Sequence, residues 1–356
     1  MSELQITAPR RLVPRRLTAG LIDSKANTAI TLLFGAILLW LFSPIWRWAF
    51  ENAVWTGSAQ TCAAESAGAC WAFIGAKLRF ILFGFYPPEL QWRPALVLLG
   101  IGAMLSLSAS PRFWSVKLVP LWLLTLLLAW LLMSGIAVRP VVPPNQWGGL
   151  PITILVSLVG LASAFPLALV LALARRSSMG ILRALSVIFI ECLRGVPLIA
   201  VLYVAMLIVP MALPAETLLD KLARAQIGIT LFVSAYLAEI IRAGLQSIPA
   251  GQTEAALSLG LGYWRTAQLV ILPQALRAVI PAIVNLSVGI LLNTSLLAVI
   301  GISDLLNTAK ISAADPNWLG FYSEAFFFAG TLYFAISFAA SRYSLWLEAR
   351  LRRGGK

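Results

Sequence analysis

Two acid–base pairs stand out in an otherwise apolar sequence, because in each a glutamate precedes an arginine by three positions. The pairs are Glu191 with Arg194 and Glu239 with Arg242. Residues three apart lie on one face of a helix, where the side chains can pair and partly neutralise each other. At membrane depth such residues often mark a substrate pathway. The alternative is an ion pair near the cytoplasmic headgroups that orients its helix, and the location of both pairs favours this alternative.

A polar cluster in a later apolar segment is a second candidate for a pathway. Asn293, Thr294 and Ser295 are consecutive, and Asn285 and Ser287 precede them by two turns of helix. Such side chains could line a route for a polar substrate. Serine, threonine and asparagine in membrane helices also hydrogen-bond to neighbouring helices, and the sequence leaves both interpretations open.

The cysteines and the absence of histidine limit the remaining chemistry. Cys62 and Cys70 fall in one predicted outer loop, where they could form a disulfide or be two unrelated small residues. Cys192 is expected to be a packing residue. The chain has no histidine and no spaced cluster of cysteines and carboxylates, so no metal site is predicted. It also lacks a nucleophile–base pair, which argues against a membrane enzyme.

The elements that must position these residues are membrane helices. Of 356 residues 60% are hydrophobic and 12% charged, and the mean hydropathy is +0.87. A bilayer core about 30 Å thick needs roughly 20 apolar residues per helix. The sequence predicts an all-α integral membrane protein with about eight spans, near 28–47, 94–110, 118–137, 150–173, 187–211, 226–242, 278–300 and 322–344.

The basic residues give these spans a direction. If the N-terminus is cytoplasmic, 18 of the 27 lysines and arginines lie on the cytoplasmic side and eight on the outer side. This is the positive-inside pattern, and it places both termini in the cytoplasm. The net charge of +13 is therefore assigned to lipid headgroups rather than to nucleic acid. No cleavable signal peptide is expected, because the first 26 residues are polar and basic.

The chain is predicted to divide near residue 148. Residues 1–148 form an extension with three spans and a long outer loop, in which residues 67–86 are expected to form an interfacial helix. A segment rich in proline and glycine, 139–150, is the linker to a five-span core at 149–345. Residues 346–356 form a basic cytoplasmic tail.

The loop between the sixth and seventh spans alternates helix formers with helix breakers. Pro249 and Gly251 open a short predicted helix, which runs through Glu254 and ends before Gly260. Gly262 follows, and a second helical stretch over 263–271 leads back to the membrane. A short helix that projects in this way suits insertion into a groove on a partner.

The residues of this loop match a family pattern. Glu254, Ala255 and Ala256, then Gly260, then Val270, Leu272 and Pro273 resemble the EAA loop of binding-protein-dependent ABC importer permeases, with Val270 in place of isoleucine. The resemblance implies that the Glu254 helix is a coupling helix seated in a cytoplasmic ATPase. In this interpretation Glu254 anchors the loop by a cap or an ion pair, the alanines allow close approach, and Gly260 permits a sharp turn.

Longer stretches narrow the resemblance. ECLRGVPLIAVLY (191–203), AYLAEIIRAGLQSIPAGQTEAA (235–256), LPQALRAVIPA (272–282) and NTSLLAVIGISDLL (293–306) resemble permeases for polar amino acids, over roughly residues 150–345. The extra N-terminal spans, with GACWAFI (68–74), resemble one of the two permeases of general L-amino-acid uptake systems. The family usually has a lysine just before the Asp/Asn-Thr-Ser of the seventh span, where this chain has Leu292.

The resemblance implies a division of labour between chains. The expected partners are a cytoplasmic ATPase dimer that binds ATP and magnesium, a second homologous permease subunit and a periplasmic amino-acid-binding protein. This chain itself is expected to bind no cofactor, since its terminal Gly-Gly-Lys lacks the rest of a phosphate-binding loop. The alternative function is an ion-coupled secondary transporter that works without an ATPase.

Overall fold

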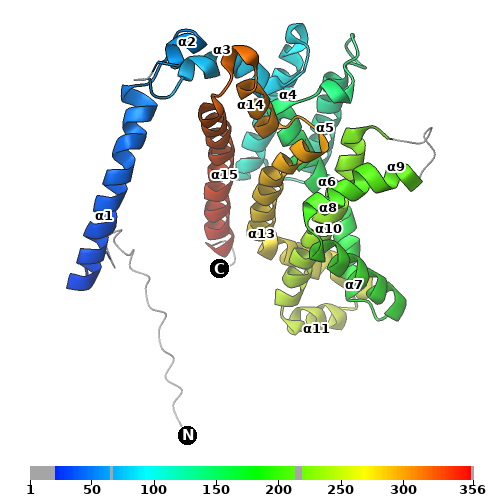
Figure 1. The fold of residues 1–356 in the computed structure, drawn as a ribbon. Coiled ribbons are helices and arrows are strands. Elements are labelled where there is room, and N and C mark those ends of the chain that lie inside the picture. Colours follow the sequence, from blue (N-terminus) through cyan, green and yellow to red (C-terminus); the bar gives the residue numbers. More distant parts are fainter. Residues whose placement is uncertain (1–20, 65–66, 213–218, 354–356) are drawn as a thin grey trace. The chain divides into compact units, whose positions relative to one another are not determined.

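The computed structural model describes residues 21–64, 67–212 and 219–353. The described chain is nearly all helical and forms two compact units, Met1–Phe73 and Ile74–Lys356 (Figure 1). Most of the basic N-terminal segment and the last three residues of the expected tail lie outside the described residues. The two units divide between residues 73 and 74 rather than near residue 148, so residues 74–148 of the predicted extension belong to the second unit.

The first unit contains one long apolar helix and a loop that is closed by a disulfide bond. Helix α1 (Lys25–Trp46) begins at Ser24, whose Oγ accepts a hydrogen bond from the amide of Asn27 at 3.2 Å. A π-helical turn at Arg47–Glu51 and helix α2 (Ala59–Cys62) follow. A disulfide joins Cys62 to Cys70. The α1 side chains are largely exposed apolar groups, as expected for a helix that faces lipid.

The remaining helices belong mainly to the second unit, with α3 beginning at the end of the first. They are α3 (Trp71–Phe83), α4 (Trp92–Ala109), α5 (Leu118–Ser134), α6 (Gly149–Arg175), α7 (Gly180–Gly195), α8 (Leu198–Tyr203), α9 (Val209–Ala212), α10 (Lys221–Ser247), α11 (Ala250–Ser258), α12 (Tyr263–Thr266), α13 (Leu272–Asn293), α14 (Leu305–Ala313) and α15 (Tyr322–Arg353).

Each of the eight predicted spans falls on a helix or on a bent pair of helices. Among the described residues, six helical stretches are long and apolar enough to cross a membrane: Lys25–Glu51, Pro88–Ala109, Gly149–Arg175, Lys221–Ser247, Tyr263–Ile300 and Tyr322–Leu351. The pair α7 and α8 adds a seventh if it crosses as one span. It bends by 105° at the break that contains Pro197, where we expected a kink. Helix α5 is shorter, at 17 residues, and α3, with 13, is too short to cross a bilayer.

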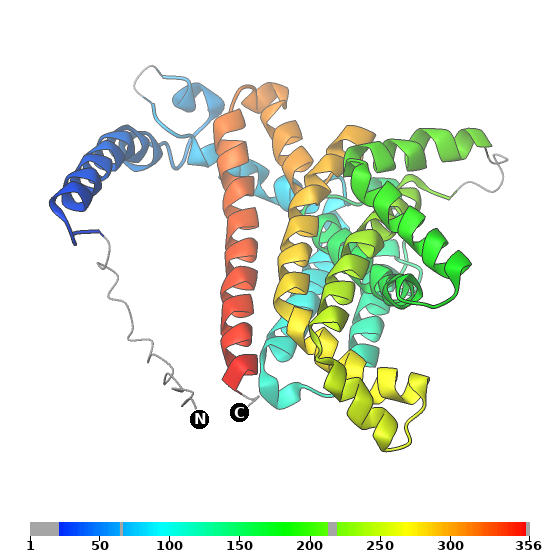
Figure 2. The same ribbon diagram turned by 90° about the horizontal axis from the view of Figure 1, so that it is seen from below.

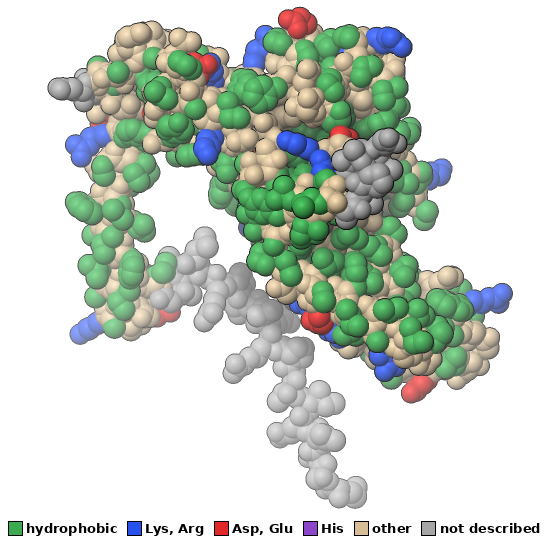
Figure 3. Space-filling model, turned by 45° about the vertical axis from the view of Figure 1, so that its right-hand side comes forward, with side chains coloured by type: hydrophobic (Ala, Val, Ile, Leu, Met, Phe, Trp, Pro, Cys, Tyr) green, Lys and Arg blue, Asp and Glu red, His purple; other side chains and the backbone are tan. Residues whose placement is uncertain are grey.

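Helix α10 lies at the centre of the second unit, packed against α6, α7 and α13. Two buried apolar clusters fill these contacts, one around Ile229 and Val233 and the other around Leu237 and Ile241. Helices α11 and α14 lie at opposite ends of this unit, and α11 projects beyond the long helices (Figures 1 and 2). On the face shown in Figure 3, charged side chains gather mostly toward the two ends, with hydrophobic side chains between them.

A buried acid fixes the end of the unit that carries α14. Asp304 caps α14, accepting hydrogen bonds from the amides of Leu306 and Asn307, both at 3.1 Å. The hydroxyl of Tyr333 on α15 donates to the same carboxylate at 3.0 Å. The amide of Leu305 donates to Thr153 on α6 at 3.0 Å. Burial raises the pKa of Asp304. Helices α6, α14 and α15 are thus joined at one polar junction, which the sequence analysis did not identify.

Candidate functional site

The loop after α10 folds much as its breakers predict. Pro249 precedes α11, and α11 ends at Ser258, where Leu259 leads into Gly260 with φ of +78°. Gly260 is thus in the left-handed region, which side chains with a Cβ adopt only at a cost. Helix α12 and a π-helical segment, Ala267–Ile271, then lead into α13. This matches the predicted second helical stretch over 263–271.

One face of α11 is held against the segment that returns to the membrane. Ala256 is buried, and its carbonyl accepts a hydrogen bond from the amide of Leu261 at 3.1 Å. The Gln274 side chain donates to Gln252 Oε1 at 3.2 Å, which connects the start of α13 to α11. Ala255, the other alanine of the motif, is exposed. The two alanines therefore differ: one packs within the loop, and the other lies on its surface.

The outer face of the loop is apolar and uncovered. Leu257 is 54% exposed and Leu259 82% exposed, and Tyr263, Trp264 and Leu269 are also exposed. Helix α11 projects away from the long helices (Figure 2). In the single chain, the end of the loop is therefore uncovered and can be reached by another protein. Large apolar side chains exposed together in one short loop are typical of a site of protein association.

The Glu254 side chain extends from α11 without a partner among the described residues. Among the described residues, its carboxylate has no hydrogen bond and no ion pair, whereas its backbone carbonyl accepts a hydrogen bond from Ser258 Oγ at 2.9 Å. Glu254 is the middle residue of α11 and its side chain is exposed, and no backbone amide or basic group among the described residues binds it. A cap or ion pair that anchors the loop therefore stays a prediction, and the carboxylate is free to bind a partner.

The helices before and after the loop, α10 and α13, approach each other closely at Gly244. Gly244, near the end of α10, faces Ala275 in the first turn of α13. A Cβ built at Gly244 would lie 2.7 Å from the Ala275 carbonyl oxygen and 2.6 Å from Val279 Cγ1. Such distances leave no room for a side chain. The helices before and after the loop are therefore in backbone contact at its base, so the loop is expected to move with them as one piece.

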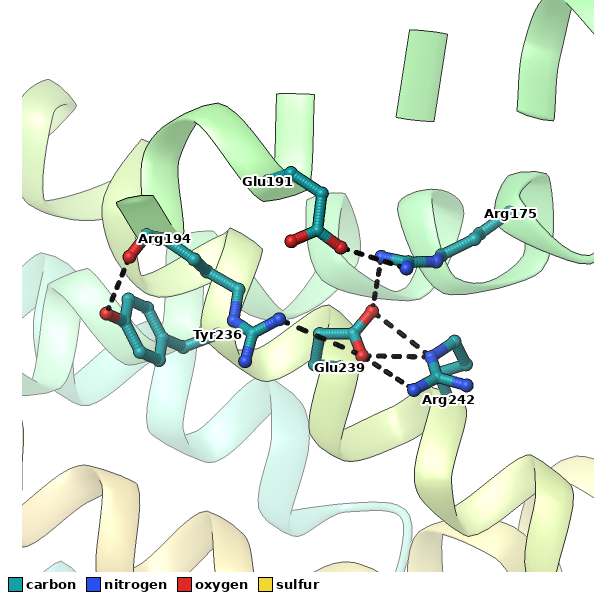
Figure 4. Close-up of polar contacts among 6 residues, drawn as sticks. All are labelled: Arg175, Glu191, Arg194, Tyr236, Glu239 and Arg242. Atoms are coloured by element: carbon teal, nitrogen blue, oxygen red, sulfur yellow. Dashed lines mark hydrogen bonds and ion pairs between the residues drawn. The ribbon is translucent and has the colours of Figure 1, made fainter. Parts of the chain in front are cut away.

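Near this base, an ion-pair cluster joins α6, α7 and α10 (Figure 4). Glu239 on α10 lies among three arginines. Its carboxylate is 2.6 Å from Arg175 Nη1, 2.8 Å from Arg242 Nη2 and 4.0 Å from Arg194 Nη1. Arg175, from the last turn of α6, also binds Glu191 on α7 at 2.9 Å. The cluster holds three basic and two acidic groups and leaves a net positive charge.

The structure corrects one of the two predicted pairs. Glu239 and Arg242 bind each other as their spacing predicts, but Glu191 and Arg194 do not, although they lie on one helix. The Glu191 carboxylate instead binds Arg175, which approaches from a neighbouring helix. Arg194 lies over the ring of Tyr236, with its guanidinium carbon 5.6 Å from the ring centre. For Glu191, an arginine on a neighbouring helix is therefore the partner instead of the arginine three positions along its own helix.

A small cavity adjoins the cluster through Tyr236. It has a volume of about 170 Å³ and is lined mainly by apolar side chains, together with Asn293 and Thr294. The hydroxyls of Thr294 and Ser295 donate to carbonyls of their own helical segment, at 2.7 and 2.8 Å. Ser295 does not line this cavity. Of the predicted polar cluster, Asn293 and Thr294 therefore line this cavity, and the Thr294 hydroxyl is also bonded to the Leu291 carbonyl.

The other predicted polar residues of α13, and the cysteine on α7, lie away from this cavity. Asn285 lines a different cavity, between α13 and α15, together with Ser337 and Ser341. Ser287 donates to the carbonyl of Ile283 at 2.8 Å, an intrahelical bond. Cys192, expected to pack inside the protein, is exposed on α7 of the single chain.

Comparisons with known proteins agree with this arrangement. Residues 164–353 match the family model described as binding-protein-dependent transport system inner membrane component. The chain is 43% identical over 344 residues to the inner membrane amino-acid ABC transporter permease protein YhdY of Escherichia coli (strain K12). That alignment covers 94% of this chain and 92% of the relative.

Two further proteins extend the comparison. The glutamate/glutamine/aspartate/asparagine transport system permease protein BztC of Rhodobacter capsulatus is 33% identical, over 94% of this chain and 92% of its own. A crystal structure of an amino acid ABC transporter with histidines matches with a TM-score of 0.51 and 28% identity. It covers 58% of this chain and 92% of the matched chain.

These relationships support an ABC importer over an ion-coupled transporter. Members of the matched family are the membrane components of ABC importers, which work with an ATPase and a substrate-binding protein. The apolar helices described above fit such an inner membrane component. The chain therefore belongs to the binding-protein-dependent transport system inner membrane components and, among them, to the permeases of amino-acid ABC transporters.

Proposed function

We propose that this chain is the translocating subunit of an importer for polar or general L-amino acids, driven through the loop that contains α11. The observation that carries this proposal is the loop itself, with exposed Leu257 and Leu259 at the end of α11, a Glu254 side chain without a partner among the described residues, and the left-handed turn at Gly260. In it, α11 inserts into a cleft on a cytoplasmic ATPase, two copies of which bind ATP and magnesium. The α11 end of the chain and both termini are cytoplasmic, which the distribution of basic residues supports.

The proposed mechanism needs a lever and a bistable interface rather than a chemical group. When two ATPases close, α11 moves, and the backbone contact between Gly244 and Ala275 transmits the motion to α10 and α13. Glu239 lies on the same uninterrupted helix, two turns before its end. The ion-pair cluster then keeps α6 and α7 aligned with α10 while a second permease subunit moves against this one.

The proposed substrate class follows the names of the relatives, which are amino-acid permeases. A periplasmic binding protein would deliver the amino acid, and it would pass the cavity lined by Asn293 and Thr294. Leu292, at the position where the family usually has lysine, is 46% exposed and directly precedes Asn293 in the sequence. The chain thus has no lysine at that point to meet a substrate carboxylate, which leaves selectivity to the binding protein and to the second permease subunit.

Reconstitution tests the division of labour. The purified chain alone, placed in liposomes with an ion gradient, is expected to transport no amino acid. Addition of the second permease, the ATPase and the binding protein should give uptake that depends on ATP. Uptake by the chain alone would refute the proposal. Labelled amino acids that enter cells only when the gene is intact would identify the substrate.

A matched pair of glycines tests the loop. A Cβ at Gly260 or at Gly262 would meet no atom within 4 Å, but only Gly260 has a positive φ. Gly260→Ala should strain the turn by about 1–2 kcal/mol and reduce transport per ATP hydrolysed. Gly262→Ala, with φ of −69° in the wild type, should retain coupling. Equal coupling in the two variants would remove the role assigned to the turn.

A further inference from the structure

The end of the second unit that carries α14 is joined to α3 by contacts distant in sequence. Lys77 Nζ on α3 lies 2.7 Å from Asp315 Oδ2, just after α14. The Thr308 hydroxyl on α14 donates to the carbonyl of Ile81 at 2.7 Å. A Cβ at Gly84 would lie 2.8 Å from the Cα of Gly148, so the chain after α3 also meets the start of α6. Helix α3 comes from the predicted extension, whereas α14 belongs to the predicted five-span core.

An open notch of about 700 Å³ lies between these two elements. Its walls include Lys77, Arg79 and Gln91 on one side and Ile311 and Asp315 on the other. The notch contains two bases and one acid. Because Asp315 is already paired with Lys77, the remaining unpaired charge is that of Arg79.

Arg79 is held in one orientation although it is exposed. Its Nε donates to Gln91 Oε1 at 2.9 Å, and its Nη2 donates to the carbonyl of Pro88, also at 2.9 Å. Gln91 is itself buried, and its amide nitrogen donates to the carbonyl of Tyr86 at 3.2 Å. Within the described residues Arg79 forms no ion pair, and its Nη1 takes part in no hydrogen bond. A guanidinium fixed in this way has lost its side-chain entropy before a partner arrives.

We propose that Arg79 and this notch form a docking site for an acidic surface of the substrate-binding protein. The inference rests on the proposed function, which places α3 and α14 on the outer face, where that protein approaches. A free amino acid fits less well, since the only acid of the notch is occupied and cannot receive its ammonium group. A single preorganised guanidinium suits one carboxylate within a larger protein interface. The extension would thereby add a contact that the five-span core does not contain.

The test uses the assembled transporter in nanodiscs and the purified binding protein that stimulates wild-type ATP hydrolysis. Arg79→Gln should raise the half-stimulating concentration of this protein by about threefold to tenfold, while basal and maximal hydrolysis remain unchanged. Arg79→Lys retains the charge but loses the planar guanidinium group. Its half-stimulating concentration should lie between those of the wild type and Arg79→Gln. Arg139→Gln removes an exposed arginine outside the notch and serves as the matched control. The salt dependence of the half-stimulating concentration should also weaken in Arg79→Gln.

Three results would overturn the inference. The first is an unchanged half-stimulating concentration in Arg79→Gln. The second is an altered dependence on free amino acid at saturating binding protein, which would assign the notch to a small ligand. The third is a change in basal hydrolysis that follows the anionic lipid content, which would assign Arg79 to headgroups. Failure of the proposed function looks different, because the binding protein would then not stimulate the wild-type transporter at all.

Discussion

Arg175 at the end of α6 lies 2.6 Å from Glu239 on α10, and the same guanidinium binds Glu191 on α7. One side chain thus joins three helices (Figure 4). Glu239 precedes the end of α10 by eight residues, which is about 12 Å along the helix, and α11 follows within three residues. The ion pairs therefore lie close enough to the loop to be affected when it moves.

Glu239→Gln should destabilise the protein by about 2 kcal/mol, because three arginines lose the carboxylate that they share. Its side chain is only 14% exposed, so water compensates little. Glu191→Gln is the control, since that side chain is 53% exposed and binds one arginine. Glu191→Gln should lower the free energy of unfolding by less than about 1 kcal/mol. Thermal unfolding of the two purified variants in detergent measures the difference, and equal midpoints would contradict the central role of Glu239.

The sequence predicts more of the fold than of this cluster. Hydrophobic length locates the helices, and Gly260 and Pro249 define the loop after α10, because these signals are local. Arg175 lies in the last turn of α6, a helix that contains no acidic residue to suggest a partner. The pairing of Arg175 with Glu191 and Glu239 depends on which helices are neighbours, and the spacing of residues along one helix contains no such information. The junction at Asp304 was missed for the same reason.

Gly244→Ala should weaken the base of the loop. The new methyl group would meet the Ala275 carbonyl oxygen at 2.7 Å, and backbone cannot give way as a flexible side chain does. We expect a loss of about 1–3 kcal/mol in unfolding free energy, together with lower transport per ATP. Gly100→Ala on α4 is the control, because a Cβ there meets no atom within 4 Å. Unaltered stability and coupling in Gly244→Ala would show that α10 and α13 do not need this contact.

Leu259→Asp should weaken binding of the ATPase without affecting the folding of this chain. The side chain is 82% exposed, so the free energy of unfolding of the isolated chain should change by less than about 0.5 kcal/mol. In the complex, the carboxylate would replace an apolar contact, and we expect the ATPase to dissociate more readily. Co-purification of the ATPase with the tagged permease measures this loss, and the melting temperature of the permease alone provides the control. Full retention of the ATPase would place its docking surface elsewhere.

The pair of Lys77 and Asp315 should make stability depend on pH in acid. The hydrogen bond from Lys77 lowers the pKa of the Asp315 carboxyl below its usual 3.8. A lowered pKa in the folded state means that the unfolded chain takes up the proton first as the solution is acidified. The stabilisation is therefore complete above about pH 5 and is lost as the pH falls through the folded pKa, below 3.8.

Lys77→Gln should flatten this part of the profile, because the Asp315 pKa then returns toward its usual value. The amide of Asn317 still donates to Asp315 at 2.8 Å, so part of the shift should remain. Unfolding midpoints between pH 6 and pH 3 should fall more steeply in the wild type than in Lys77→Gln. Asp315→Asn should resemble Lys77→Gln near neutral pH, and the double variant should add little, since both changes remove one interaction. Parallel profiles for wild type and Lys77→Gln would mean that this pair does not join α3 to α14 in solution.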